Sequence, residues 1–149
     1  MPRKEVSIRS RQMSAIKELL RAEADGSLSF GDYELPEKTK LSDFRHEGDI
    51  YKVKTYGEIT RLEKNDSLVY ESVPGTAVTN LQYTGDEVSF TVEGKEDADI
   101  TLGLAEETAY EIIVNGESAG VMTTNLGGKL SFGVELSEGV PTGIDVKVK

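Results

Sequence analysis

The dipeptide Asn115-Gly116 is the sequence feature that most restricts how this chain can fold. Asparagine and glycine readily adopt the positive φ angles that a type I′ hairpin turn requires, and apolar residues alternate with polar ones on both sides of them. The alternation continues after a second turn at residues 125–128, which is rich in glycine. The pattern therefore predicts three antiparallel strands that form a meander, over residues 110–114, 119–124 and 130–136.

Short alternating segments recur along most of the chain. The clearest covers residues 88–93, where Val88, Phe90 and Val92 alternate with polar side chains. Turn residues separate these segments. We expect Asn65-Asp66 to form a hairpin turn and Pro74-Gly75 to occupy the centre of a type II turn. About nine or ten strands at spacings of roughly 8–12 residues indicate an all-β fold, an antiparallel β-sandwich of jelly-roll or immunoglobulin-like type.

Residues 13–26 depart from the strand pattern and predict the single helix. Their apolar side chains fall on one side of a helix, and Asp25-Gly26 follows as a stop signal. A helix this short is marginal in water, so its apolar stripe must pack on the protein's own sheets or on a neighbouring subunit. We therefore predict a self-association surface that comprises Met13, Ile16, Leu19 and Leu20.

The chain has the length of one ordinary domain, 149 residues. Its first twelve residues contain Arg3, Lys4, Arg9 and Arg11 against one acid, Glu5. We expect a disordered basic tail over residues 1–12, the amphipathic helix over residues 13–26 and one β-sandwich domain over residues 27–149. Met13 would serve as well as Met1 to begin the folded unit.

The charge and residue usage exclude several classes of function. The net charge of −10 repels phosphate, so the body of the domain is not expected to bind nucleic acid. Solubility is the simplest reason for this acidity. The chain has no cysteine, which excludes disulfides, thiol nucleophiles and cysteine-ligated zinc.

The apolar segments of the chain are short. None approaches the roughly 20 apolar residues of a membrane-spanning helix, and the first residues lack the apolar run of a secretory signal peptide. We therefore expect a cytoplasmic protein that does not associate with membranes.

His46 is the single histidine of the chain and lies in a polar segment with Asp43, Glu47 and Asp49. An imidazole beside a carboxylate can act as a general base, but no serine in a nucleophile-elbow sequence accompanies it. We therefore interpret His46 as a solvated loop residue.

Acidic side chains offer two further types of chemistry. A glycosidase needs two carboxyl groups about 5–9 Å apart, but with 27 acidic residues the sequence does not single out a pair. Residues 93–99 could supply calcium ligands, although Asp97 and Asp99 match only a fragment of the alternating ligand pattern. Residues 125–128 join two strands and open no helix, so they do not predict a phosphate site. We expect no catalytic residue, metal or cofactor.

Tyrosines suggest a carbohydrate as an alternative ligand, because aromatic rings are the usual surfaces on which β-sandwich modules stack sugars. The chain has no tryptophan, and most of its tyrosines lie in strands, where they are expected to pack in a core or an interface. The six candidates are Tyr33, Tyr51, Tyr56, Tyr70, Tyr83 and Tyr110.

Four segments carry a resemblance to a known group of proteins: LSFGDYEL at 28–35, GDIYKVKT at 48–55, VYESVPGTAV at 69–78 and TNLGGKL at 124–130. Together they resemble small uncharacterised proteins of clostridial and related gut Firmicutes that often carry the label endosialidase. The resemblance covers about residues 13–149. Endosialidases as a class use a large propeller domain whose arginines bind the substrate carboxylate. Because 149 residues are too few for such a domain, the resemblance assigns no catalytic residue here.

The sequence thus predicts a non-enzymatic β-sandwich protein that acts through binding or self-assembly, as a homo-oligomer or with a protein partner. The alternative is a carbohydrate-binding module or a glycosidase-related, endosialidase-like protein. The first hypothesis rests on the lack of a catalytic motif, the predicted apolar stripe and terminal strands whose edges can accept another strand.

Overall fold

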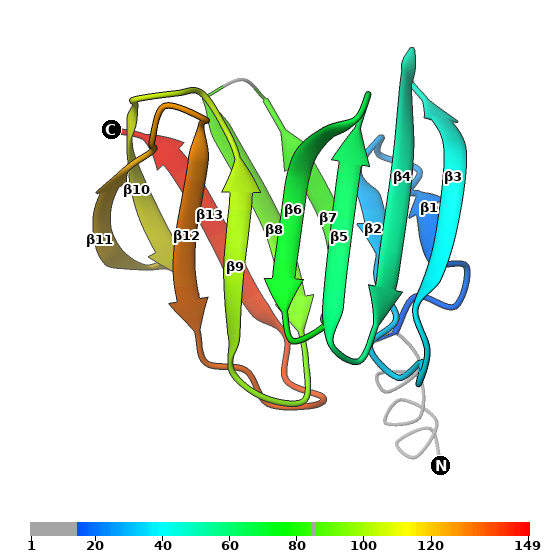
Figure 1. Cartoon of the computed structure of the whole chain (residues 1–149). Helices are drawn as coiled ribbons and strands as arrows, with labels where there is room; N and C mark the ends of the chain where they lie inside the picture. Colours follow the sequence, from blue (N-terminus) through cyan, green and yellow to red (C-terminus); the bar gives the residue numbers. More distant parts are fainter. Residues whose placement is uncertain (1–14, 85) are drawn as a thin grey trace.

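The computed structural model describes residues 15–84 and 86–149, and within them it contains strands and no helix (Figure 1). The all-β prediction is confirmed. Thirteen strands are present in these two ranges, more than the nine or ten predicted. The additional strands include one at residues 20–22, inside the predicted helix, and one at residues 39–46, in a polar segment that reads as a loop. The predicted tail over residues 1–12 lies outside the described residues.

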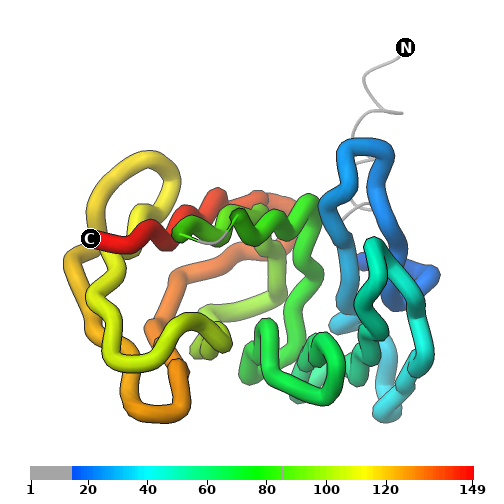
Figure 2. The backbone as a smooth tube through the Cα atoms, turned by 90° about the horizontal axis from the view of Figure 1, so that it is seen from above, coloured from blue at the N-terminus to red at the C-terminus, as the bar shows by residue number. Residues whose placement is uncertain are grey.

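The strands form two antiparallel sheets. One sheet has seven strands in the order β1 (Leu20–Ala22), β2 (Leu28–Phe30), β7 (Ala77–Tyr83), β8 (Glu87–Glu93), β13 (Thr142–Val148), β10 (Ala109–Val114) and β11 (Glu117–Thr123). The other has six strands in the order β12 (Lys129–Val134), β9 (Ala98–Gly103), β6 (Ser67–Val73), β5 (Ile59–Lys64), β4 (Asp49–Tyr56) and β3 (Thr39–His46). Figure 2 looks along the strands and shows the two sheets as separate layers.

Inward-facing side chains of both sheets build one hydrophobic core. Its centre is a row of three rings: Tyr70 of the six-stranded sheet makes edge contacts with Phe30 and Phe90 of the seven-stranded sheet, at centroid distances of 5.3 Å and 5.6 Å. The predicted alternation in β8 is confirmed, because Val88, Phe90 and Val92 are all buried. Burial of one face of each sheet is therefore what holds the two layers together.

The predicted helix over residues 13–26 is wrong. Leu20 begins β1, which pairs antiparallel with β2, and Asp25 and Gly26 lie in the turn between the two strands. The helix-like spacing of Ile16 and Leu20 arises from a turn, in which the Leu19 amide donates to the Ile16 carbonyl and Leu19 adopts a φ of 73°. Pairing with β2 and burial in the core outweigh the weak helical preference of so short a segment.

The predicted meander is correct for its first hairpin only. Asn115 and Gly116 have φ angles of 50° and 85° and connect β10 to β11 as expected. However, β12 belongs to the opposite sheet, where it pairs with β9. Alternation determines which side chains face the core, and it does not determine which strand is the neighbour.

The two other predicted turns have different outcomes. Asn65 and Asp66 form the expected hairpin turn, with φ angles of 50° and 68°. The type II turn at Pro74-Gly75 is wrong, because such a turn requires a positive φ at Gly75, and Gly75 lies outside the left-handed region. Gly75 instead allows close packing, since a Cβ atom there would lie 2.1 Å from the carbonyl oxygen of Tyr56.

Among the described residues there is no helix of the length and apolar character needed to cross a membrane.

Candidate functional site

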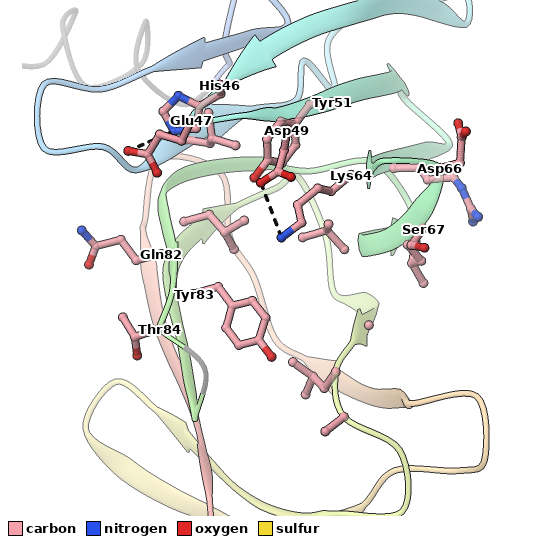
Figure 3. Close-up of a pocket in the computed structure, with 18 of the residues that line it drawn as sticks. His46, Glu47, Asp49, Tyr51, Lys64, Asp66, Ser67, Gln82, Tyr83 and Thr84 are labelled. Carbon is pink, nitrogen blue, oxygen red and sulfur yellow. Dashed lines mark ion pairs between the residues drawn. The ribbon is translucent and has the colours of Figure 1, made fainter.

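A cleft of about 970 Å³ lies between the two sheets at one end of the molecule. We call this end the open end and define it by the β3–β4 and β5–β6 turns and the end of β7, which lie at the top of Figure 1. The six-stranded sheet contributes the first two turns to the cleft wall and the seven-stranded sheet contributes the end of β7 (Figure 3). The volume lies at the upper end of the range for small-molecule sites.

Asp49 and Lys64 form an ion pair in this cleft, with 3.8 Å between Oδ2 and Nζ. The other oxygen of Asp49 accepts a hydrogen bond of 2.9 Å from the Asn65 side-chain amide. The Asn65 side-chain oxygen in turn accepts the backbone N–H of Ile50. Asn65 thus ties the β5–β6 turn to the β3–β4 turn, and it holds the Asp49 carboxylate in a fixed orientation.

His46 has a structural role at the same end. Its Nε2 donates a 2.9 Å hydrogen bond to the Gly26 carbonyl, and its ring makes an edge contact with Tyr51 at 6.1 Å. Only 13% of its side-chain surface is exposed, so the interpretation of His46 as a solvated loop residue is wrong. This hydrogen bond connects the β3–β4 turn to the β1–β2 turn, so His46 stabilises the fold at this end.

Two tyrosines face the cleft from opposite sheets, Tyr51 from β4 and Tyr83 from β7. Half of the Tyr83 surface is exposed, whereas Tyr33, Tyr70 and Tyr110 are buried. Figure 3 shows the Tyr83 ring reaching into the cleft. The Tyr51 and Tyr83 hydroxyls make no hydrogen bond with another described residue, so both are available to a ligand.

The pKa values of both cleft phenols are raised. Burial is the main cause for Tyr51, with a further contribution from the charges of Asp49 and Glu47. Burial is also the main cause of the raised pKa of Tyr83, and electrostatic interactions with Tyr110 and Asp86 raise it further. Since an unperturbed phenol already ionises only near pH 10, both groups are neutral hydroxyls at physiological pH.

Apolar side chains form the inner part of the cleft. Leu28 and Leu81 belong to the hydrophobic core and also line the cleft, and the partly buried Leu104 does the same beside β9. The cleft therefore combines an apolar interior with a polar rim, which is the usual composition of a small-molecule site.

The other chemistries considered from the sequence do not converge on this cleft. Within the described part of the chain, Glu93 is the carboxyl whose pKa is raised, mainly by burial, and it lies at the end of β8 away from the open end. Asp97, a candidate calcium ligand, accepts the backbone N–H of Leu136. In residues 15–84 and 86–149, no three histidine, aspartate or glutamate side chains are grouped so that they could hold a metal ion.

The predicted self-association residues lie at a different place. Ile16 and Leu20 are buried and Leu19 packs against the chain's own core, while Met13 lies outside the described residues. The apolar surface of Ile16, Leu19 and Leu20 is thus covered within the same chain.

No protein-family model, curated protein or solved structure matches this chain. The cleft residues were not recognised as a set from the sequence either, because Asp49, Lys64 and Tyr83 are far apart in it. One signal would have brought them together. In a run of antiparallel strands every second strand ends at the same end of the fold, and this places the ends of β3, β5 and β7 at one end of the molecule.

Proposed function

We propose that this chain is a non-enzymatic β-sandwich domain, of jelly-roll or immunoglobulin-like type, that acts in the cytoplasm by binding a ligand in the cleft at the open end. The observation that carries this proposal is the pair Tyr51 and Tyr83, which face one cleft from opposite sheets with hydroxyl groups that bond to no other described residue. These partly exposed hydroxyls can exchange water for a ligand, whereas the buried Tyr70 hydroxyl is bonded to Thr76 within the protein.

Binding is favoured over catalysis by the state of the ionisable groups in the cleft. Asp49 is held by Asn65 and paired with Lys64, and His46 donates to a backbone carbonyl. A general acid in a glycosidase requires a raised pKa, and the carboxyl of this kind, Glu93, does not line the cleft. The resemblance to endosialidase-labelled proteins contributes no residue to the proposal.

A ligand screen with matched variants tests the proposal. The full chain, Tyr83→Ala and Tyr56→Ala are screened by thermal shift against a small-molecule library. Tyr56 is the control because it belongs to β4, as Tyr51 does, but lies at the opposite end of that strand and does not line the cleft. We expect compounds that raise the Tm of the wild type and of Tyr56→Ala without raising that of Tyr83→Ala. Compounds that stabilise all three proteins equally would argue against the cleft.

Self-assembly is the second candidate, and the edge strand β11 supports it. All seven residues of β11 are exposed, and its apolar side chains Val121 and Met122 are 49% and 40% exposed. Residues 118–123 carry no charge in a chain of net charge −10, so two copies could approach each other there with little repulsion. The proposed partner is a second copy that pairs its own β11 with this edge.

Light scattering tests this second candidate on the full chain. Self-assembly through β11 predicts a mass above that of the monomer, and Val121→Pro should return the mass to that of the monomer because proline removes a backbone donor. A monomer in both proteins would eliminate this candidate.

A further inference from the structure

We infer that the ligand of the cleft is an uncharged carbohydrate, bound between Tyr51 and Tyr83 and through the Asp49–Lys64 pair. This inference rests on the proposed function and specifies the chemical class of the ligand. It draws on three properties of the cleft: its aromatic faces, its polar groups and its charge.

The aromatic faces match the shape of a sugar ring. A pyranose presents C–H groups on a face and hydroxyl groups around its rim, so it needs an apolar platform next to hydrogen-bonding groups. Tyr83 offers such a platform on one wall and Tyr51 offers the aromatic surface of the other wall. Each tyrosine also carries a neutral hydroxyl beside its ring, which can bond to the rim of the sugar.

The polar groups of the cleft suit neighbouring hydroxyls of a sugar. Asp49 is an acceptor and Lys64 is a donor, and their charged atoms lie 3.8 Å apart, longer than a hydrogen bond and loose enough for a hydroxyl to bond to both. Gln82 and Ser67 also line the cleft, and their side chains make no hydrogen bond with the rest of the described chain. Carboxylate, ammonium, amide and hydroxyl groups together match a ligand whose hydroxyls both donate and accept.

The charges around the cleft disfavour an acidic sugar. The lining carboxylates Asp25, Glu47 and Asp66 have no lysine or arginine paired with them in the described part of the chain, whereas Lys64 is paired with Asp49. Arg61 also lines the cleft, but its guanidinium is engaged by Glu63 and Glu71. Lys129 is the lining cation that forms no ion pair with a described residue, and the three carboxylates that lack a lysine or arginine partner outnumber it. Electrostatic repulsion therefore favours a neutral glycan over a sialylated or uronic one.

Hydrogen bonds within the protein hold one wall of the cleft in place. The β3–β4 turn is held by the His46 bond to Gly26 and by the Asn65 bond to Asp49. A site that is already ordered loses little conformational entropy on binding, which matters for sugars because each of their hydrogen bonds replaces one to water.

The test begins with a glycan array probed with the full chain. The array carries neutral cello-, malto- and galacto-oligosaccharides and their sialylated and uronic acid counterparts. We expect binding to one or more neutral glycans and weaker or no binding to the acidic ones. Binding confined to acidic glycans would overturn the inference.

Calorimetry with the best neutral oligosaccharide then locates the site. We expect Tyr83→Ala and Asp49→Asn each to weaken the affinity about tenfold or more, and Tyr56→Ala to leave it unchanged. Asp49→Asn keeps the size of the side chain, so its folding is not in question. Equal affinity in all four proteins would overturn the inference.

The outcomes also separate the two proposals. If no glycan binds but another compound binds in a manner that depends on Tyr83, the carbohydrate assignment fails and the cleft remains the binding site. If neither glycans nor library compounds bind, the proposed function fails as well.

Discussion

The two ends of the molecule use the same types of polar side chain in opposite ways. At the end away from the cleft, which we call the closed end, the hydroxyl groups of Tyr70 and Ser72 both bond to the Thr76 hydroxyl at 2.7 Å. Thr60 bonds to the Thr76 backbone and to Thr55, and all five residues are buried. At the open end, the hydroxyls of Tyr51 and Tyr83 and the amide of Gln82 bond to no described partner.

The polar groups of the closed end thus stabilise the fold, whereas those of the open end are available to a ligand. A buried hydroxyl that loses its partner costs free energy, so the hydroxyl network of the closed end holds the β6–β7 connection in place. A half-exposed hydroxyl can bond to water and can exchange that water for a ligand at little cost. Substitutions at the two ends should therefore have different consequences for stability and for binding.

The largest effect on stability is expected for Tyr70→Ala. Tyr70 is fully buried between Phe30 and Phe90, so its removal leaves a large cavity and takes away one of the two hydroxyl partners of Thr76. We expect a loss of about 3–5 kcal/mol in the free energy of unfolding. Urea denaturation of the full chain measures it, and Tyr83→Ala, which removes the same side chain at the open end, should lose about 1 kcal/mol or less. Equal losses would contradict the distinction between the two ends.

The next effect is expected for Thr76→Val, which keeps the shape of the side chain and removes its hydroxyl. Tyr70 and Ser72 would each lose a buried hydrogen-bond partner. We expect about 1–3 kcal/mol of destabilisation with no change in glycan affinity. Denaturation and calorimetry on the same protein preparation check both parts. A change in affinity would mean that the two ends are coupled.

A smaller and more selective effect is expected at Asn65, which has a φ of 50° and bonds to Asp49. Asn65→Ala strains the backbone and should destabilise the protein by about 1 kcal/mol, whereas glycine tolerates this φ. Asn65→Gly should therefore retain most of the stability but weaken glycan binding, because Asp49 is no longer oriented. If Asn65→Gly binds as tightly as the wild type, Asn65 does not position the site.

The smallest effect concerns the pH dependence of stability. Burial raises the pKa of Glu93, and its Oε2 atom is buried with no hydrogen-bond partner among the described residues. The folded state therefore holds this proton to a higher pH than the unfolded chain. Its favourable contribution is present below pH 4.5 and is lost as the pH rises through the folded pKa. Glu93→Gln should flatten this fall in stability, which denaturation at a series of pH values measures. An unchanged slope would mean that Glu93 is not its source.

The elements that the sequence predicted correctly are those governed by local rules. Asn115-Gly116 and Asn65-Asp66 form the expected turns because their side chains tolerate positive φ, and Val88, Phe90 and Val92 face the core as their alternation requires. The type II turn at Pro74-Gly75 failed because Gly75 is needed for contact with Tyr56, a residue that is distant in the sequence.

The candidate site was less accessible from the sequence, for the same reason. Tyr51 and Tyr83 were among the six tyrosines considered for sugar binding, but the sequence did not show which of them would share a cleft. Their position depends on how the two sheets are arranged, and the strand order depends on long-range pairing that alternation does not encode. Ile16 and Leu20 show how a local pattern can mislead. Their spacing is typical of a helix, but Ile16 takes part in a turn and Leu20 begins a strand, and both side chains are buried there.

The most direct test of the account is a titration of the ¹⁵N-labelled full chain with the neutral oligosaccharide that binds best on the array. Amide chemical shifts report which residues meet the ligand. We expect shifts at the open end, around Tyr51, Asn65 and Tyr83, and unchanged amides around Thr76 at the closed end. Shifts centred on the closed end or on β11, with Tyr83 unaffected, would contradict it.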